Sequence, residues 1–521
     1  MASNRYKKFK DYHPGQGMLL PPYLDDLIEA EHLVRVVNEV VDEISDEVIC
    51  KSFDQEGGPA YHPRMMLKVI IFAYCQKIYS CRMIAKALRE SIPFMWLAGF
   101  SMPSFMTINR FRSEYLTEVL EDIFTQVLDL LHEKGYIQFE TYFVDGTKLE
   151  ANANKNTYVW KKNTERYKEM VQERVKHLFE EIEQLNQQED QQYGDKDLAE
   201  RGVGKTITAE EIKTAARKIN DQLKKADQPK KGKQQLERIA RHLDKEAENL
   251  EGYQQQEKIL GERNSYSKTD PDATYMQTKG KQIRPAYNVH ISTENQFITH
   301  YSVSQNAADS AGFTEHVDQI RARGEKYLPE NYSSDSGYGN EENYEKLEEH
   351  GINNYMKFNN FHFEQTNAFK NNPFLKEHFL YDPQQDYYIC PKGRKLFFRE
   401  VKTIKTKTGY ESQAKVYECE GCTGCEFKDK CFRAKGNRTI EIRTKLESYK
   451  DQARKNLNSE KGIKLRKQRN VDVEPVFGDW KHNQAYIRLR LRGNDKVQTD
   501  IGWLSISHNI RKLQIRLKTA V

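Results

Sequence analysis

The stretch Tyr142-Phe-Val-Asp-Gly-Thr-Lys-Leu-Glu-Ala-Asn-Ala-Asn154 determines how the rest of the chain can be interpreted. Its apolar start, from Tyr142 to Val144, is typical of a short buried strand. Asp145 follows, where this strand is predicted to meet Gly146. Burying a carboxylate costs free energy unless a cation compensates its charge. The stretch therefore fits a divalent-metal ligand at a strand end, although an Asp-Gly turn would explain the same residues.

Length and composition describe a soluble protein of several domains. The chain has 521 residues, a hydrophobic fraction of 37% and a mean hydropathy of −0.86. This length predicts about two to four domains. No run approaches the roughly 18 apolar residues of a membrane span, and the N-terminus lacks the apolar core of a signal peptide. We therefore expect a cytoplasmic protein without a membrane partner.

Positive charge is concentrated at the C-terminus. The net charge is +5, but residues 464–521 hold 13 Lys and Arg against 5 Asp and Glu. That segment thus carries +8 and the remainder −3. Such a distribution favours a polyanionic partner, although a solvated basic helix face would show the same pattern.

Helical periodicity dominates the N-terminal part. One helix is predicted over Asp25–Ile44, and a compact helical module over residues 61–116. The last helix of the module, Met106–Tyr115, should expose Arg110 and Arg112. Short helices with a basic final helix permit a helix-turn-helix that binds DNA, but many helical bundles share the pattern.

A charged segment follows Trp160. Residues 161–261 are rich in Lys, Glu, Gln and Arg, with thinly spaced apolar residues. We expect long exposed helices, interrupted near residues 193–208 and at Pro229. The segment is interpreted as a solvated helical hairpin without a core of its own.

Strand signals return after this insertion. Residues 284–303 hold two alternating runs that meet at Glu294-Asn295, which predicts a β-hairpin. A helix, a strand that leads to Asp335, a second helix and a short strand are then predicted. Their expected ranges are 311–323, 332–335, 341–350 and 353–358. This order predicts an α/β sheet with mixed strand directions.

Three acids could form a metal site if the chain brings them together. Asp145 and Asp335 follow predicted strands, and Glu474 lies near the start of a late helix. Carboxylate oxygens suit Mg²⁺ or Mn²⁺, and two such ions can support phosphodiester cleavage or strand transfer. Spacing alone does not establish that the acids converge.

Five of the eight cysteines cluster late in the chain: Cys390, Cys419, Cys422, Cys425 and Cys431. In a cytosolic protein this favours metal binding over disulfides. Four thiolates around Zn²⁺ would stabilise a segment with little core, with Cys390 as the alternative to one of the other four. Unligated thiols and an iron–sulfur cluster are the other interpretations.

Three blocks resemble those of the DDE transposases of bacterial insertion sequences. They are Phe143–Asn154, Asp335–Tyr344 and Val473–Lys481. The N-terminal helical module, the charged insertion, the cysteine block and the closing helix also resemble this family. The resemblance implies an RNase H-like catalytic core with Asp145, Asp335 and Glu474 as metal-binding acids.

The resemblance also implies a function. Such a protein binds the terminal inverted repeats of its element, cleaves the ends with Mg²⁺ or Mn²⁺, and joins them to target DNA. Its partner would be double-stranded DNA, bound as a homodimer and associated with the nucleoid. A silent DNA-binding regulator and a related metal-dependent nuclease are the alternatives. The expected DNA-contacting residues are Lys481, Arg469, Arg488, Arg490, Arg492, Arg110 and Arg112.

The expected fold class is therefore α/β (α+β multidomain). The RNase H-like mixed-sheet core should comprise residues 136–160, 265–375 and 455–521. The other parts are an N-terminal arm, a helical DNA-binding-like domain, the helical-hairpin insertion and the cysteine-rich insertion. Their expected ranges are 1–60, 61–135, 161–264 and 376–454.

Overall fold

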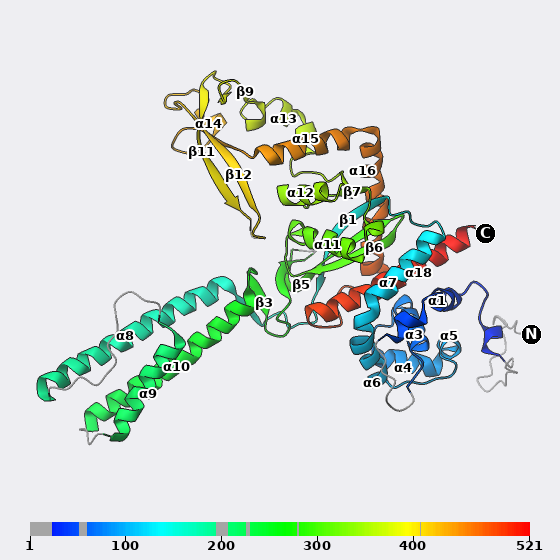
Figure 1. Cartoon of the computed structure of the whole chain (residues 1–521), viewed down its shortest axis with the longest axis horizontal. Helices are drawn as coiled ribbons and strands as arrows, with labels where there is room; N and C mark the ends of the chain where they lie inside the picture. The colour runs from blue at the N-terminus through cyan, green and yellow to red at the C-terminus, as the bar shows by residue number, and fades with distance from the viewer. Residues whose placement is uncertain are drawn as a thin grey trace, which may run out of the picture. The chain divides into compact units, whose positions relative to one another are not determined.

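The computed structural model describes residues 23–51, 60–193, 207–225, 230–278, 281–406 and 408–520 (Figure 1). The chain divides into two compact units. One is Met1–Leu130 with Trp503–Val521, and the other is Leu131–Gly502. No helix among the described residues is long and apolar enough to cross a membrane.

The first unit is helical. Its central helix, α3, starts with Pro63 at its first turn and buries nearly every residue from Met66 to Cys75. Proline suits a helix start because the missing N–H would have no intrahelical partner there. The helices of this unit are α1 (Leu33–Asp42), α2 (Asp46–Cys50), α3 (Pro63–Cys75), α4 (Cys81–Glu90), α5 (Ile92–Leu97), α6 (Phe105–Arg110), most of α7 (Leu116–Glu133) and the end of α18 (Asn494–Ala520).

Two predictions for this unit were wrong in part. The single helix expected over Asp25–Ile44 is a 3-10 turn at Leu24–Leu27 followed by α1, because the His32 ring accepts the Val34 N–H and starts a new helix. Arg112 is also not exposed as expected.

The Arg112 side chain is 4% exposed and lies in the π-helical turn Phe111–Tyr115. Its guanidinium donates to the Tyr79 carbonyl at 2.9 Å and contacts the Tyr74 hydroxyl at 3.4 Å. Arg110 does lie on the surface, where it pairs with Glu114. Arg112 therefore stabilises the interior of the helical unit.

A six-stranded mixed sheet organises the second unit. Its strands are β1 (Thr141–Glu150), β4 (Thr274–Gln277), β5 (Ile283–Glu294), β6 (Phe297–Ser304), β7 (Asn331–Ser334) and β8 (Asn353–Asn354). The order is β4-β5-β1-β7-β8, with β6 also paired to β5. Strands β4, β5, β6 and β1 pair antiparallel, whereas β1, β7 and β8 pair parallel. The predicted mixed strand directions are confirmed.

Strand β1 is longer than predicted. It was expected to end at Gly146 but continues to Glu150, because residues 143–150 pair with β5. Its parallel pairing with β7 nevertheless ends at Val144 opposite Ser334. Asp145 and Asp335 are therefore the first residues beyond that parallel pair.

The predicted hairpin between β5 and β6 is confirmed. Asn295 and Gln296 connect the strands with positive φ angles of 56° and 68°, which suit a tight two-residue turn. The following helices are α11 (Phe313–Arg323), α12 (Glu341–Glu349), α15 (Thr444–Asn458), α16 (Glu460–Asp472) and α17 (Glu474–Gly478). Helix α11 contacts β6, and α16 contacts β7.

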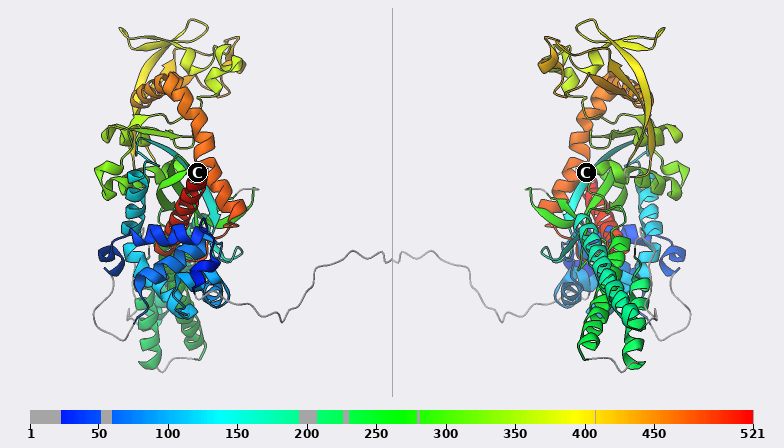
Figure 2. Two further views of the ribbon diagram at one scale, coloured as in Figure 1. Left: turned by 90° about the vertical axis from the view of Figure 1, so that its right-hand side faces the viewer. Right: turned by 90° about the vertical axis from the view of Figure 1, so that its left-hand side faces the viewer.

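The charged insertion forms three long helices, not a solvated pair. They are α8 (Lys161–Tyr193), α9 (Ala209–Lys225) and α10 (Lys230–Leu260), which lie side by side (Figure 2). Sixteen buried residues, including Val171, Ile212 and Leu243, form a core among them, so the expectation of no core was wrong. Of the interruption predicted near residues 193–208, residues 194–206 fall outside the described residues, as does Pro229.

The insertion starts and ends at one place. Strand β2 (Tyr158–Trp160) leads into α8 and pairs antiparallel with β3 (Ser265–Ser267), which follows α10.

The cysteine block contains a separate five-stranded antiparallel sheet. Its strands are β9 (Leu380–Asp382), β10 (Tyr387–Ile389), β11 (Lys395–Lys405), β12 (Glu411–Cys419) and β13 (Thr439–Ile442). Cys419 and Cys422 belong to its small core, together with Leu396 and Tyr417.

Candidate active site

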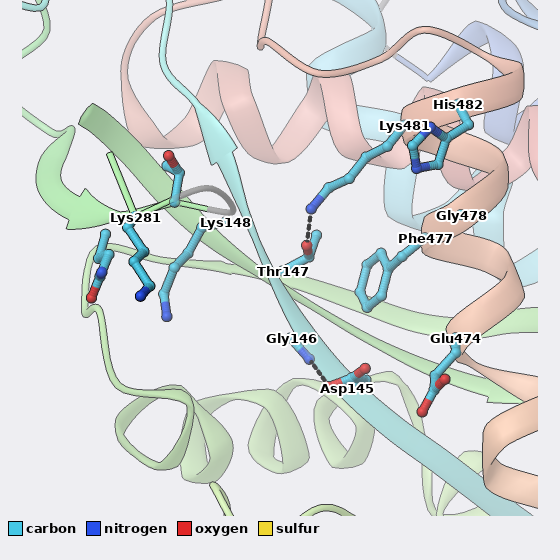
Figure 3. Close-up of a pocket in the computed structure, with 12 residues that line it drawn as sticks. Asp145, Gly146, Thr147, Lys148, Lys281, Glu474, Phe477, Gly478, Lys481 and His482 are labelled. Carbon is cyan, nitrogen blue, oxygen red and sulfur yellow. Dashed lines mark hydrogen bonds between the residues drawn. The ribbon is translucent and has the colours of Figure 1, made fainter. Parts of the chain in front are cut away.

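A cleft of about 670 Å³ lies between strand β1 and the α17 segment (Figure 3). Asp145 reaches it from the strand and Glu474 from the facing helix. The lining residues are Asp145, Gly146, Thr147, Lys148, Gln277, Thr278, Lys281, Glu474, Phe477, Gly478, Lys481 and His482. The cleft thus combines carboxylates with several basic side chains.

Asp145 carries an unusually high pKa. Its pKa is raised from 3.8 to about 6, chiefly by burial and in smaller part by the nearby carboxylates of Asp335 and Asp309. Arg469 and the Gly146 N–H, which donates to Oδ1 at 2.9 Å, oppose the rise. A carboxyl group that is partly buried among other acids lacks sufficient compensating charge.

Arg469 joins two of the three predicted acids. Its guanidinium lies 3.3 Å from Asp145 Oδ1 and 3.5 Å from Glu474 Oε1, and its side chain is 6% exposed. Since one planar guanidinium spans both contacts, the two carboxylate oxygens lie within about 9 Å of each other. Arg469 was expected to contact DNA phosphate, whereas in this structure it faces the acids.

Asp335 approaches Asp145 from the neighbouring strand. Both residues directly follow adjacent parallel strands, at the same level. Neighbouring strands of a sheet lie about 5 Å apart. Asp335 Oδ1 accepts the Gly337 N–H at 2.9 Å. Asp335 does not line the cleft itself. The cleft therefore lies on one side of Asp145, and the loop that carries Asp335 lies on another.

Glu474 has two acidic neighbours in sequence that have other contacts. The Asp472 carboxylate is buried and accepts from the Thr293 hydroxyl at 2.8 Å and the Gln296 N–H at 3.0 Å. The Asp479 carboxylate accepts from Asn483 at 3.1 Å. Glu474, 55% exposed at the first position of α17, is the acid of this segment that faces Arg469.

Basic groups occupy the rest of the cleft. Lys481 Nζ donates to the Thr147 hydroxyl (Figure 3). Lys148 and Lys281 come from β1 and from the turn before β5, and His482 neighbours Lys481. A cleft of this composition can bind a polyanion beside the acids.

Two of the predicted DNA-contacting arginines bind the backbone. Arg488 donates to the carbonyls of Ala151 and Ala153 at 3.1 and 3.0 Å, and Arg492 donates to the carbonyl of Asn152 at 2.6 Å. These bonds connect the segment after β1 to residues 488–492, which follow a second π-helical turn at Asp479–Asn483. Arg490 is exposed.

The structure adds two residues that sequence reasoning missed. Asp309 follows β6, and its carboxylate accepts from Asn288 at 2.7 Å. Lys357 follows β8, and burial together with two arginines lowers its pKa, whereas Asp335 and Glu474 raise it. Neither residue has a local motif. For Lys357, the one signal available in the sequence was its position between two apolar residues, Met356 and Phe358, both of which are buried.

Histidine and tyrosine side chains lie beneath the acids. His290 Nδ1 is 2.7 Å from the Tyr338 hydroxyl, and both residues are fully buried. Burial lowers the pKa of His290 to about 4. Burial and the neighbouring acids raise the pKa of Tyr338. Both groups are therefore neutral at physiological pH.

The chemistry of the donors fits a divalent cation. Three acids with only oxygen donors are the ligand type that Mg²⁺ and Mn²⁺ prefer. A Cβ atom at Gly337 would lie 3.1 Å from Asp335 Oδ1 and 3.5 Å from Asp309 Oδ2, so the glycine leaves space between carboxylates. Within the described residues, however, no group of three or more acids, histidines or cysteines is already arranged to hold a metal ion.

The five clustered cysteines line one small cavity. Its volume is about 20 Å³, and Phe374, Phe427 and Phe432 share its wall. The Arg438 N–H donates to Cys422 Sγ at 3.3 Å, and the Cys419 thiol lies 3.8 Å from the Gly421 carbonyl.

Comparison with protein families gave two matches. A family model described as a transposase DDE domain matches residues 389–514, and a model described as a transposase domain (DUF772) matches residues 22–114. The first match includes Glu474 and Lys481, whereas Asp145 and Asp335 precede it. Searches of curated proteins and of solved structures found no match.

Proposed function

Since two transposase family models match this chain and support a DDE transposase of an insertion sequence, we propose that it cleaves the ends of its element and joins them to target DNA. The observation that carries the proposal is the convergence of acids beside a basic cleft. Asp145 and Asp335 leave adjacent parallel strands, and Arg469 links Asp145 to Glu474. The mixed sheet that supports them is consistent with an RNase H-like core.

In this proposal Asp145, Asp335 and Glu474 hold Mg²⁺ or Mn²⁺. When bound, these ions supply activation of the attacking oxygen and stabilisation of the leaving oxygen. The chain itself contributes the three carboxylates that hold these ions beside the basic cleft. With a pKa of about 6, the Asp145 carboxylate is mostly ionised at neutral pH and becomes protonated below pH 6.

Arg469 has a balancing role in the same proposal. Its buried guanidinium offsets part of the repulsion between Asp145 and Glu474. It therefore keeps two like charges close together before DNA binds, one of them at the buried position of Asp145, where desolvation disfavours the ionised form.

The basic cleft would bind DNA phosphates. Lys481, Lys148 and Lys281 line the same space as Asp145 and Glu474. Lysine ammonium groups act as point charges for phosphate, and such contacts position a duplex without reading its sequence. The proposed partner is double-stranded DNA, on which two copies of the chain would hold the two element ends.

Substitution of the acids tests the proposal. Asp145→Asn and Asp335→Asn should abolish Mg²⁺-dependent cleavage of element-end DNA and retain binding in a gel-shift assay. Asp479→Asn is the matched control, because it removes an acid from the same segment as Glu474 whose carboxylate accepts from Asn483, and it should still cleave. Cleavage by both aspartate variants would refute the proposal. Joined products distinguish a transposase from a nuclease.

We also propose that the cysteine block holds a structural Zn²⁺. All five thiols line one cavity of about 20 Å³, which is close to the volume of a single small occupant. Cys390 begins a tight turn in which its carbonyl accepts the Gly393 N–H at 2.8 Å. Zinc bound by four thiolates would stabilise the small core of this sheet.

Metal analysis of purified protein tests the zinc proposal and identifies the spare cysteine. Cys422→Ser should lower the zinc content well below one ion per chain. Cys390→Ser and Cys419→Ser should differ from each other in zinc content, because five thiols are available for about four ligand positions. Zinc-free wild-type protein purified without chelators would refute the site.

A further inference from the structure

Asp309 lies on the loop between β6 and α11, at the first residue of the 3-10 turn Asp309–Gly312. Aspartate often caps a helical turn from the N-cap position, but the N-cap residue here is Ala308 and no side chain caps the turn. The Asp309 carboxylate accepts instead from Asn288 Nδ2 at 2.7 Å. The orientation of this side chain is therefore not explained by local turn structure.

Asn288 holds Asp309 from inside the sheet. It lies on β5, directly opposite Lys148 of β1, and is fully buried. Its Oδ1 atom has no hydrogen-bond partner among the described residues. A buried amide oxygen without a partner costs free energy. It is also an oxygen ligand of the type that hard cations accept.

The Asp309 carboxylate faces both catalytic loops. A Cβ atom at Gly146, the residue after Asp145, would lie 3.0 Å from Asp309 Oδ1. A Cβ atom at Gly337 would lie 3.5 Å from Asp309 Oδ2 and 3.1 Å from Asp335 Oδ1. Oxygens of Asp309 and Asp335 are thus at most about 7 Å apart across this position, an upper bound that includes the separation of about 4 Å or less between two oxygens bound to one Mg²⁺ or Mn²⁺ ion.

We propose that Asp309 is a fourth carboxylate of the cation site and shares one divalent ion with Asp335 over Gly337. The inference depends on the proposed function, because it assigns a further ligand to the same site. Asn288 fixes the orientation of the carboxylate through its amide nitrogen. Gly337 lacks a side chain because a side chain would fill the position that the ion takes.

Cation binding by the full-length protein without DNA tests the inference. Free Mn²⁺ is measured by electron paramagnetic resonance during titration of the wild type and of Asp309→Asn. The wild type should bind about two Mn²⁺ ions. Asp309→Asn should bind at least one of them about 10-fold more weakly or lose it. Asp429→Asn, which removes an exposed carboxylate in the cysteine block, should bind as the wild type does.

Gly337→Ala gives a second test that leaves every carboxylate in place. Gly337 is exposed and has no positive φ angle, so alanine is compatible with its backbone. The added methyl group should weaken Mn²⁺ binding about as much as Asp309→Asn, again roughly 10-fold. This measurement remains informative if Asp309→Asn fails to fold.

The outcomes separate the inference from the function. Wild-type Mn²⁺ binding in both Asp309→Asn and Gly337→Ala, together with cleavage by the wild type, overturns the role of Asp309 and leaves the transposase proposal intact. A wild-type protein that neither binds Mn²⁺ nor cleaves overturns both. Weakened Mn²⁺ binding in these variants, with unchanged binding in Asp429→Asn, supports the fourth carboxylate.

Discussion

Replacing Asp145 by asparagine should stabilise the metal-free protein while it abolishes cleavage. The pKa of Asp145 is raised from 3.8 to about 6 in the folded state. An acid whose folded-state pKa is raised contributes stability below its unfolded-state pKa and loses that stability as pH rises through the folded-state value. Above pH 6 the ionised carboxylate therefore destabilises the fold, and the neutral amide removes this cost.

The magnitude follows from the size of the shift. The rise from 3.8 to about 6 corresponds to about 3 kcal/mol at neutral pH. The pKa of about 6 already includes the attraction of Arg469 at 3.3 Å. Since the Asp145 side chain is 21% exposed, solvent screening reduces the figure, and we expect a net gain of about 1–3 kcal/mol. At pH 5 wild-type Asp145 is largely protonated, and the gain should fall to about half.

Thermal unfolding in EDTA measures the effect. At pH 7.5 Asp145→Asn should unfold about 2–5 °C above the wild type, and the difference should shrink at pH 5. Glu474→Gln is the control. Its carboxylate is 55% exposed, so its replacement should change stability by no more than about 0.5 kcal/mol. An unchanged or lowered Tm for Asp145→Asn, or a gain independent of pH, would contradict the reasoning.

Three further outcomes are expected. Arg488→Ala should lower the urea midpoint by the equivalent of about 1–3 kcal/mol, because it removes bonds from a charged group to the Ala151 and Ala153 carbonyls; an unchanged midpoint would show that these bonds contribute little. Gly339→Ala should lower Tm strongly, because its Cβ would overlap the Lys357 carbonyl oxygen, whereas Gly478→Ala has no atom within 4 Å and should change Tm little. Acidification should destabilise the second unit below pH 6.5, as followed by circular dichroism, because burial lowers the pKa of three histidines that are neutral in the fold and must be charged on unfolding. Between pH 6.5 and about 4, the free energy of unfolding that is lost through the three histidines should exceed the free energy that is gained through Asp145. A free energy of unfolding that does not fall over this range would contradict the prediction that these histidines are neutral in the fold. The histidines are His290, His300 and His316.

Local patterns in the sequence predicted those features that short segments determine. Alternating apolar residues and the Glu294-Asn295 turn predicted the β5–β6 hairpin, and helical periodicity predicted α11 and α12. The strand before Asp335 was also predicted because apolar and small residues lead to a Ser-Gly turn. These elements need few contacts from distant parts of the chain.

The features that sequence analysis missed depend on distant partners. Strand β1 continues past Gly146 because β5, more than a hundred residues later, pairs with it. Arg112 is buried with its guanidinium donating a hydrogen bond to the Tyr79 carbonyl, 33 residues earlier in the chain. Asp309 has no motif of its own, and only the packing of β5 against β1 and the β6 loop brings it to the acids.

The core of the charged insertion illustrates the same limit. Its apolar residues are thinly spaced within each helix, and one helix alone could not bury them. The apolar faces of α8, α9 and α10 pack against one another, so the three helices together bury residues that one helix alone would leave exposed. Hydropathy read along a single helix therefore underestimated how well this part is packed.

The antiparallel pairing of β2 with β3 brings the two ends of the insertion together. The insertion leaves and returns through these neighbouring strands, so a short turn of two or three residues could replace it without altering the register of the six-stranded sheet. The whole arm can thus be exchanged like a module during evolution or in the laboratory. Its length and surface are free to change while the acids remain in place.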